Sequence, residues 1–504
     1  MVSLQGKRVL IFQQRGWAVR VGHFLAKKLQ AEGCLLAALT FKKSTHRFIA
    51  EEQKEVHYEL IINDDEVATD PRKYLGDSRI ALPDVCAGLG VESIWPLVVT
   101  LKQYARSYKD KYYYSFRQNV SDHEIVDYIL SVYKYLNVFF DEFKPDVVIA
   151  PVFGDLRHIM CNLLAEKRGI KMLALADSKV RGIFVTTYGY QNDRGPFYDL
   201  VSVLNRGEAI SSNLERARTY IREFREKFKQ PDYMERVFRK KSIFQRAVDE
   251  LRPWREILEW YTNRPINEVP ALGITPDFRP PRVVLRDHFT RKRFRRGMDR
   301  FSYYPIEKLG RFVYLPLQVQ PEATIDVMSP YFNNQLEVAR EVAMSLPDDL
   351  TLAVKEHPAM AGRRNPSDYK KLSRTPNVKL IDYRLPNEVV LNRAELVVSP
   401  SSTTIAEAAF YRRAAIQLGD LGTTLLLPNV FRHTDMTTLP SKIKEVLRLN
   451  LNTLEYEQRL ENFVAAAYDT GFAVHSLEIW DRGDDESKEK IWQFYRQEML
   501  RVLS

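Results

Sequence analysis

The sequence predicts an α/β protein made of two domains, each with an open parallel sheet. Buried-type strands alternate with helical segments in residues 8–176, and the same alternation resumes in residues 312–418 after a basic stretch. Strands and helices that alternate at this length imply parallel pairing through right-handed crossovers. The length of 504 residues points the same way, because it exceeds what one ordinary core organises. We therefore expect two Rossmann-like domains.

The first half opens as a strand, a helix and a second strand. Residues 8–12 form an apolar run, the next segment has apolar residues three and four apart up to Gly33, and residues 34–40 are apolar again. Residues 44–120 are polar and aromatic, and their pattern does not allow a sequence of helices and strands to be predicted. Beyond them we expect a helix over 122–143, a strand over 147–150, a helix ending at Gly169 and a strand over 170–176.

The second half alternates more cleanly. Apolar runs predict strands at 312–317, 350–354, 378–381, 396–398 and 415–418. Helical periodicity predicts helices at 334–346, 367–373, 387–393 and 404–411, and an amphipathic helix at 487–503. The predicted domains are 1–204 and 311–480, joined by a helical, basic linker at 205–310 and followed by a final helix within 481–504.

Composition restricts the class of partner and the compartment. The net charge of +10 favours anionic partners such as phosphorylated ligands, nucleic acid or an acidic membrane surface. Three separated cysteines without a CxxC pair argue against a disulfide framework or a zinc site and favour a reducing cytoplasm. No signal peptide or membrane-spanning run is recognisable, so we expect a soluble protein or one attached to a surface.

The stretch SPSSTT, residues 399–404, is the most informative motif. It places five hydroxyls in six positions between a predicted strand and a predicted helix. A helix N-terminus carries unpaired N–H groups and partial positive charge, which suit a phosphate, and Ser401, Ser402, Thr403 and Thr404 would add donors. The alternative is a plain N-cap, with Glu407 in a capping box. We favour the ligand hypothesis, because a cap needs only one or two hydroxyls.

Two more polar loops follow strands of the same sheet. The stretch KEHP ends a strand with Lys355 and His357, which could donate to a phosphate or add charge, while Glu356 is expected to be solvated. A structural histidine beside a proline turn is the alternative. The stretch PLQVQPE supplies three further polar side chains, Gln318, Gln320 and Glu322. Ligands of open parallel sheets bind at the carboxyl ends of the strands, so the three loops could meet at one crevice.

The loop PVFGDLRH in the first half occupies an equivalent strand end. Asp155 or His158 could serve there as a general base, near an acceptor. Each could equally be an ordinary surface or ion-pair residue. The chain has no GxGxxG, GxxxxGK[ST], GxSxG or HExxH motif, which removes the main support for dinucleotide, P-loop, serine hydrolase and zincin assignments. No DxD-type pair stands out either, so the predicted site uses no metal.

The run TRKRFRR, residues 290–296, is the most basic segment. Aromatic residues stand close to it at Phe289, Phe294 and Phe301. A solvated face is the simplest interpretation. Contact with an anionic membrane surface is the functional alternative, and nucleic acid is not expected because no recognition motif accompanies the run.

Three stretches carry a resemblance: YLPLQVQPEATI (314–325), VKEHP (354–358) and VVSPSSTTIAEAAFYRRAAIQLGD (397–420). They resemble the bacterial capsule polysaccharide biosynthesis family, which includes the Kdo transferases of capsule and surface glycolipids. Members look like GT-B glycosyltransferases, in which two Rossmann-like domains face a cleft and the nucleotide sugar sits mainly on the second. The resemblance also implies that the last helix crosses back to the first domain.

The resemblance implies roles for individual residues. His357, Ser401, Ser402 and Thr403 would hold the nucleotide and phosphate of the donor, and Glu407 would lie beside the ribose. Many members have a glycine-containing version of the SPSSTT loop, and the acidic-acidic-glycine motif that sialyltransferases use for their base is absent here. The donor and the catalytic base therefore stay open.

The expected function is transfer of a sugar from a CMP- or UDP-linked donor to a surface glycan or glycolipid, at the cytoplasmic side of the membrane, with no other cofactor. Three alternatives remain at this point: a teichoic-acid-type polyol-phosphate transferase, a sugar-nucleotide epimerase, and a non-catalytic scaffold of a polysaccharide assembly complex.

Overall fold

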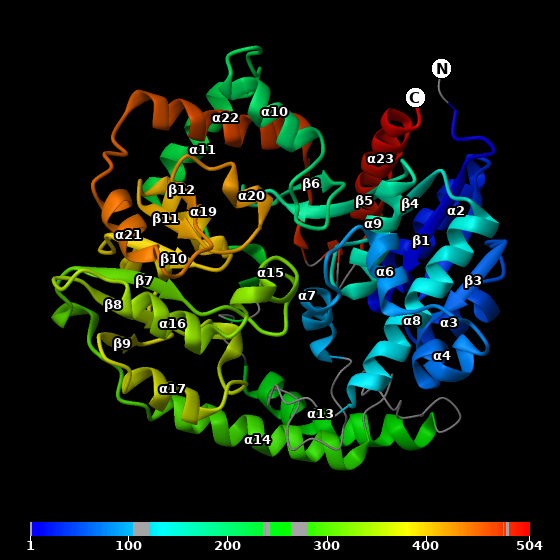
Figure 1. Cartoon of the computed structure of the whole chain (residues 1–504), viewed down its shortest axis with the longest axis horizontal. Coiled ribbons are helices and arrows are strands. Elements are labelled where there is room, and N and C mark those ends of the chain that lie inside the picture. Colours follow the sequence, from blue (N-terminus) through cyan, green and yellow to red (C-terminus); the bar gives the residue numbers. More distant parts are fainter. Residues whose placement is uncertain are drawn as a thin grey trace. The chain divides into compact units, whose positions relative to one another are not determined.

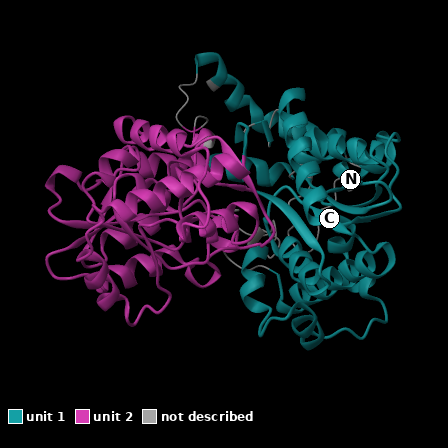
Figure 2. Ribbon diagram, turned by 90° about the horizontal axis from the view of Figure 1, so that it is seen from above, with its two compact units in different colours: residues 1–175, 238–289, 472–504 teal, residues 176–237, 290–471 magenta. Residues whose placement is uncertain are grey.

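The computed structural model describes residues 3–103, 120–234, 237, 242–263, 280–476, 478–479 and 483–504. The chain separates into two compact units (Figure 2). Unit 1 comprises residues 1–175, 238–289 and 472–504, and unit 2 comprises residues 176–237 and 290–471. Residues 176–204, which the sequence analysis grouped with the first half, cluster with unit 2. The predicted α/β architecture with two parallel sheets is confirmed.

The first sheet is built around β1. Its strands β5, β4, β1, β2 and β3 are neighbours in that order and run parallel, and β6 and β13 continue the sheet beyond β5. Val9 pairs with Leu36 on one side and with Val147 on the other. The strands are β1 (Arg8–Gln13), β2 (Leu35–Thr40), β3 (Leu60–Asn63), β4 (Val147–Ile149), β5 (Lys171–Asp177), β6 (Ile183–Thr187) and β13 (Phe472–Ala473).

Helices connect and cover these strands (Figure 1). The helices between β1 and β4 are α1 (Arg15–Trp17), η1 (Ala18–Gly22), α2 (His23–Ala31), α3 (Lys43–Arg47), η2 (Phe48–Glu52), α4 (Asp64–Thr69), α5 (Pro71–Leu75), α6 (Leu82–Leu89), α7 (Trp95–Val98), η3 (Val99–Gln103), α8 (Asp122–Val138) and η5 (Phe139–Phe143). The next helix, α9 (Leu156–Lys167), leads from β4 to β5. The sequence explains the ends of α8: Ser121 and Glu124 form a capping box, and the helical segment stops before Lys144 and Pro145.

The last helix of the chain, α23 (Asp485–Val502), belongs to unit 1. The Tyr495 hydroxyl donates to the Ala150 carbonyl oxygen at 2.9 Å. Arg496 donates to Glu32 at 2.8 Å, next to the end of α2. The helix thus returns to the sheet that opens the chain.

The sheet of unit 2 has the order β12-β11-β10-β7-β8-β9, and all its pairs are parallel. Its strands are β7 (Phe312–Pro316), β8 (Thr351–Lys355), β9 (Val378–Ile381), β10 (Leu396–Ser399), β11 (Ala414–Gln417) and β12 (Val430–Arg432). The helices are α15 (Ala323–Asp326), η9 (Pro330–Phe332), α16 (Gln335–Met344), η10 (Pro358–Met360), α17 (Pro366–Ser373), α18 (Asn387–Leu391), α19 (Thr403–Phe410), α20 (Gly422–Leu425), α21 (Leu439–Leu447) and α22 (Leu454–Thr470).

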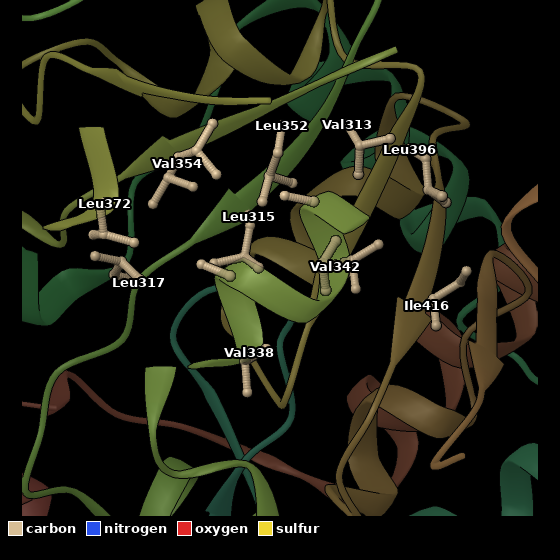
Figure 3. Close-up of a cluster of buried hydrophobic side chains, with 14 of the residues drawn as sticks. Val313, Leu315, Leu317, Val338, Val342, Leu352, Val354, Leu372, Leu396 and Ile416 are labelled. Atoms are coloured by element: carbon tan, nitrogen blue, oxygen red, sulfur yellow. The ribbon is translucent and has the colours of Figure 1, made fainter. Parts of the chain in front are cut away.

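An aliphatic core covers one face of this second sheet (Figure 3). Val313, Leu352 and Leu396 lie on three neighbouring strands, and Val338 and Val342 of α16 pack against the same cluster. These strands are buried on both faces, because a second cluster that includes Tyr314, Ala353 and Val397 lies on the other side. Burial on both faces explains why the strands read as continuous apolar runs.

Residues 176–237 bring further helices to unit 2. These are α10 (Pro196–Asn205), α11 (Leu214–Glu226) and η6 (Asp232–Met234). Phe224 of α11 stacks on Phe410 of α19 with ring centroids 4.1 Å apart, and Phe197 of α10 packs against Phe463 of α22. This cluster ties the middle of the chain to the sheet of unit 2.

The basic stretch forms two helices, α13 (Ile243–Thr262) and α14 (Pro281–Asp299), followed by η8 (Ile306–Lys308). A capping box of Ser242 and Gln245 starts α13, and Pro253 lies inside it. Among the described residues, no helix has the length and apolar character needed to cross a bilayer.

Candidate functional site

The candidate site lies at the carboxyl edge of the unit 2 sheet, where the strand order reverses. The chain runs from β7 outward to β8 and β9, then returns to the other side of β7 as β10. Such a switch point leaves a crevice beyond the strand ends. The loops after β8 and β10 flank the loop after β7, so they start about 10 Å apart, two strand spacings. The three loops selected from the sequence therefore meet at one edge.

Some hydroxyls of the SPSSTT loop form hydrogen bonds within the protein, and others have no partner among the described residues. Ser402 caps α19, because its Oγ accepts from the Thr404 N–H at 3.1 Å. The hydroxyl of Ser401 donates to the Thr324 carbonyl oxygen and lies 2.9 Å from the Ser329 hydroxyl. Both serines are buried. They hold the loop in place and are not open to a ligand in this structure.

Thr403 and Ser399 are the hydroxyl residues of this loop without a partner. Thr403 is half-buried, and its hydroxyl and N–H make no hydrogen bond within the described residues. The Ser399 Oγ is buried at the end of β10, also without a partner in the described part of the chain. Thr404 is buried, and its Oγ1 accepts a long bond of 3.4 Å from the Asn387 side chain. Thr403 is therefore the residue of the loop best placed to meet a ligand.

His357 caps the short helix η10. Its Nδ1 accepts from the Ala359 N–H at 3.2 Å, so in the neutral ring the proton resides on Nε2. Burial, reinforced by the positive charges of Lys355 and Arg363, lowers the pKa of His357 to about 4. The ring is half-buried, and Nε2 makes no hydrogen bond within the described residues. His357 thus presents a neutral N–H donor near neutral pH.

Lys355 and Glu407 belong to one buried chain of polar groups. The Lys355 ammonium donates to the Leu385 carbonyl oxygen at 2.8 Å and to Asn387 Oδ1 at 2.5 Å. The Asn387 amide donates to Glu407 Oε2 at 2.9 Å, and Arg181 donates to Glu407 Oε1 at 2.6 Å. Burial lowers the pKa of Lys355 to about 8, against the opposing effect of the Glu407 charge. Both carboxylate oxygens of Glu407 are thus already bonded within unit 2.

Glu356 is not solvated, and the expectation that it would be was wrong. It is fully buried, and its two oxygens accept from the His357 N–H at 2.8 Å and from Arg364 at 2.6 Å. Arg364 also donates to the Gln318 carbonyl oxygen at 3.2 Å. The Tyr369 hydroxyl adds a third bond to Glu356 at 3.0 Å. This buried ion pair fixes the backbone at His357 and joins the loops after β8 and β7.

The loop after β7 contributes mainly internal contacts. Gln318 donates to the Ser402 hydroxyl at 3.1 Å and to the Pro316 carbonyl oxygen at 2.8 Å. Gln320 donates to Asp326 and to the Asn333 carbonyl oxygen, each at 3.1 Å. Both glutamines are buried. Glu322, by contrast, has an exposed side chain at the start of α15.

Gly419, in the loop after β11, is required by close packing at the same edge. Its N–H donates to the Pro400 carbonyl oxygen at 2.7 Å. A Cβ at this position would lie 2.7 Å from the Met328 carbonyl oxygen and 2.8 Å from that of Pro400. Only glycine fits between the two loops.

Asp155 and His158 belong to unit 1, where they form a dyad at the end of β4. The His158 Nδ1 and the Asp155 Oδ1 are 3.0 Å apart, so the carboxylate accepts and Nε2 carries the free lone pair. That Nε2 is buried without a partner in the described residues. The ring stacks on Phe41 and packs on Phe12, with centroid distances of 5.6 and 4.9 Å.

A buried cluster behind the dyad was not predicted. Arg157 donates to both Asp155 and Asp64, and the hydroxyls of Tyr128 and Tyr135 donate to Asp64 at 2.8 and 2.9 Å. The sequence could not predict this cluster, because Asp64 and Arg157 are 93 positions apart. Asp64 also lies in the region 44–120, for which no helices or strands were predicted. In unit 2, Arg181 was missed because it lies 226 positions from its partner Glu407. Arg364 and Asn387 are nearer in sequence to their partners Glu356 and Glu407, but no motif marked them as members of the site.

No family model matches the chain, and no curated protein matches it. Solved structures similar to it include a β-Kdo 2,7-transferase, KpsC, from Thermosulfurimonas dismutans, at 13% identity and a TM-score of 0.35 over 81% of this chain and 97% of that one. A glycosyltransferase from Rickettsia africae is similar at 10% identity and a TM-score of 0.27, over 99% of each chain.

A UDP-GlcNAc 2-epimerase from Neisseria meningitidis bound to UDP-GlcNAc is similar at 9% identity and a TM-score of 0.22, over 97% of this chain and 100% of that one. Identities this low leave the function to be argued from the residues of the site itself.

Proposed function

We propose that the protein is a glycosyltransferase whose unit 2 binds the nucleotide-phosphate part of a sugar donor. The observation that carries the proposal is the arrangement at the β7–β10 switch point. There the half-buried imidazole of His357 and Thr403, the first residue of α19, flank the loop after β7. The His357 Nε2–H and the N–H and hydroxyl of Thr403 make no hydrogen bond within the described residues. The similarity of three sequence stretches to the capsule polysaccharide family favours the same function.

The first step of the argument concerns the charge that these donors would meet. When a glycosidic bond to a phosphate breaks, negative charge builds on the leaving phosphate. The Nε2–H of His357 and the hydroxyl and N–H of Thr403 at the N-terminus of α19 are donors of the kind that stabilises such charge. Donors that are already fixed before the reaction stabilise the developing charge more than mobile donors do. The His357 ring is fixed because its Nδ1 accepts a hydrogen bond from the Ala359 N–H.

The second step concerns the protonation state of His357. With its pKa lowered to about 4, the ring is neutral above mildly acidic pH and still donates through Nε2. A neutral donor binds a phosphate without adding a buried positive charge. Lys355 lies behind it and supplies positive charge to the region, although its ammonium bonds to Leu385 and Asn387.

The third step assigns supporting roles to the remaining predicted residues. Ser401, Ser402, Gln318 and Gln320 hold the loops through bonds within unit 2, while Glu407 anchors Asn387. We propose that these residues position the donor site and that Thr403, Thr404, His357 and Glu322 line it. Because Glu407 already accepts from Arg181 and Asn387, a ribose hydroxyl would have to share or displace one of these bonds.

The fourth step concerns the base. We propose that the Asp155–His158 dyad accepts the proton of the attacking hydroxyl, because the Asp155 carboxylate leaves the Nε2 lone pair available. That atom is closed off from solvent in this structure, so the role requires a local movement that opens it. A purely structural histidine, stacked on Phe41, would show no effect on turnover beyond its effect on stability.

Nucleotide binding and turnover by the full chain test the proposal. We expect CMP or UDP to bind the protein in titration calorimetry, and one member of a panel of nucleotide sugars, which also includes CDP-glycerol, to be hydrolysed slowly without acceptor. Replacing His357 by Ala is expected to lower kcat about 10²-fold or more, the usual effect of losing one preorganised donor. His123 is exposed, and its replacement by Ala is the matched control.

Each outcome decides between the candidate functions. Hydrolysis of CDP-glycerol alone would replace the sugar transferase with a polyol-phosphate transferase. Interconversion of a nucleotide sugar without net hydrolysis would identify an epimerase. Failure of every nucleotide to bind the folded chain would leave the scaffold as the remaining function.

A further inference from the structure

Helix α13, which is labelled in Figure 1, carries a concentration of exposed apolar side chains. Seven large apolar residues of this helix are between 50% and 86% exposed, a set that we name the apolar stripe: Ile243, Phe244, Val248, Leu251, Trp254, Leu258 and Tyr261. Isolated exposed hydrophobic residues are normal on a soluble protein, but a contiguous group marks an interaction surface.

The apolar stripe follows the period of the helix. At about 100° per residue, its members fall within roughly 140° of the helix circumference. Pro253, on the remaining part of the helix, is buried, and Ile257 is half-buried. The helix therefore buries one side at Pro253 and Ile257 and leaves the apolar stripe, among which the exposed Arg255 and Thr262 also lie, uncovered by the described residues.

Helix α14 carries a matching line of positive charge. Arg282, Arg286, Phe289, Arg293 and Arg296 recur at spacings of three and four residues, so they fall within about 80° of one side of the helix, and we name this set the basic stripe. Phe289 is 62% exposed. Val283, Phe294 and Met298, on the opposite side, are buried.

Most arginines of the basic stripe have no counter-charge among the described residues. Arg282, Arg293 and Arg296 are exposed and form no ion pair within the described part of the chain. Arg286 differs, because it pairs with Asp287 at 2.7 Å. Unpaired arginines at this density repel one another, so an anionic surface that meets them all at once would stabilise the arrangement.

Helix α14 begins in unit 1 and continues into unit 2, because residues 238–289 belong to unit 1 and residues 290–471 to unit 2. Within unit 1, His288 of α14 approaches Glu250 of α13 at 3.7 Å. At about 100° per residue, Glu250 lies about 20° beyond the edge of the apolar stripe. The apolar stripe and the unit 1 part of the basic stripe are thus carried by two helices that contact each other.

We propose that α13 and the part of α14 that belongs to unit 1, residues 281–289 with Arg282, Arg286 and Phe289, form a docking surface for an acidic phospholipid bilayer. Amphipathic helices with aromatic and aliphatic residues on one face and arginines beside it lie in the headgroup region, where apolar burial and attraction to anionic lipids add together. The net charge of +10 acts in the same direction.

Vesicle binding by the full chain tests this surface. We expect sedimentation with vesicles of phosphatidylcholine and phosphatidylglycerol, binding at least about tenfold weaker to phosphatidylcholine alone, and loss of binding as salt is raised. The fluorescence of Trp254 reports directly on insertion of α13 into the bilayer. Lipids brominated on their acyl chains should quench tryptophan fluorescence in the parent chain and much less in a Trp254→Phe variant.

Variants with matched controls distinguish binding through this surface from nonspecific adsorption to vesicles. The double variant Leu251→Glu/Leu258→Glu and the double variant Arg282→Glu/Arg286→Glu should each weaken binding to acidic vesicles about tenfold or more. Leu454 is 90% exposed and Arg374 is exposed, and both lie outside the two stripes, so Leu454→Glu and Arg374→Glu should leave binding unchanged.

Three results would overturn the inference. The first is absence of binding to acidic vesicles by the folded chain. The second is loss of binding in the control variants to the same extent as in the stripe variants. The third is that the stripe variants keep their vesicle binding but lose another interaction. That interaction would be a concentration-dependent dimer, measured by light scattering, or a complex with RNA. Circular dichroism spectra identical to that of the parent chain would show that each variant is folded.

Discussion

The side-chain amide of Gln318, just beyond β7, donates a hydrogen bond of 3.1 Å to the hydroxyl of Ser402, the residue that caps α19. This bond crosses the switch point of the unit 2 sheet and connects residues 84 positions apart. The backbone of Gln318 is held in turn by Arg364, the partner of Glu356. One chain of buried bonds thus joins all three loops of the candidate site.

Replacement of Ser402 by Ala should lower both stability and nucleotide affinity. Loss of an N-cap costs about 1 kcal/mol of unfolding free energy. Because the start of α19 and Gln318 both depend on this hydroxyl, we also expect nucleotide affinity to fall about tenfold, which corresponds to about 1.4 kcal/mol. Thermal unfolding and titration calorimetry measure the two effects.

The control is a second cap far from the site. Thr453 caps α22 by accepting from the Tyr456 N–H at 3.1 Å. Thr453→Ala should reduce stability by a similar amount and leave nucleotide affinity unchanged. Equal losses of affinity in both variants would show that Ser402 acts through stability alone.

The buried pair of Glu356 and Arg364 predicts a large effect on stability. Replacing Glu356 by Ala leaves the Arg364 guanidinium buried and uncompensated, so we expect a loss of about 3–5 kcal/mol of unfolding free energy in urea titrations. The exposed pair of Glu337 and Arg340 provides the comparison, because Glu337→Ala should change stability by less than about 1 kcal/mol. Similar small effects at both sites would contradict the central role of the buried pair.

The strands and longer helices were predictable, and the reason is burial. The strand expected at 396–398 is β10, Leu396–Ser399, and the helix expected at 404–411 is α19, Thr403–Phe410. Strands that are covered on both faces must be apolar throughout, so they stand out from the polar loops that bound them. The same physics identified the carboxyl edge of the sheet as the place to expect a ligand, and that expectation stays a prediction.

The helices and strands of residues 44–103 were not predicted from the sequence, because they are short and lie at a sheet edge. β3 has four half-buried or buried residues, and helices α3 to α7 are four to eight residues long. Helices of one or two turns are too short for a 3.6-residue period to emerge. Side-chain roles were unpredictable for another reason: Arg181 reaches Glu407 from 226 positions away, and no local pattern encodes such a pair.

The lowered pKa of His357 predicts a pH dependence of stability. In the folded chain the pKa of His357 is about 4, against 6.5 for an unperturbed histidine side chain. Between these values the unfolded chain binds more protons at this site, so stability rises with pH across this window and falls as the pH drops from 6.5 toward 4. The contribution is roughly 1–2 kcal/mol, less than the full shift because the ring is half-buried and partly screened by solvent.

Urea titrations of the parent chain and of His357→Asn across this pH window measure the effect. The variant should lose part of the pH dependence, whereas His123→Asn, at an exposed position, should retain it. Nucleotide affinity should also be maintained from pH 6 to 8, a window that lies above the folded pKa of about 4. Affinity that rises steeply below pH 6 would show that the charged imidazolium binds the phosphate instead.

Substitutions in the Asp155–His158 dyad should reduce turnover without changing nucleotide affinity. Asp155→Asn removes the acceptor that keeps the His158 proton on Nδ1, and His158→Gln removes the proton acceptor itself. General-base catalysis contributes about 10²–10⁴-fold, so we expect kcat to fall by about that factor in both variants. CMP or UDP should bind as before, because the proposed nucleotide site is formed by residues of unit 2 alone. Loss of nucleotide binding together with turnover would indicate that the substitution unfolds the chain beyond unit 1, and a normal kcat would make His158 a core residue stacked on Phe41.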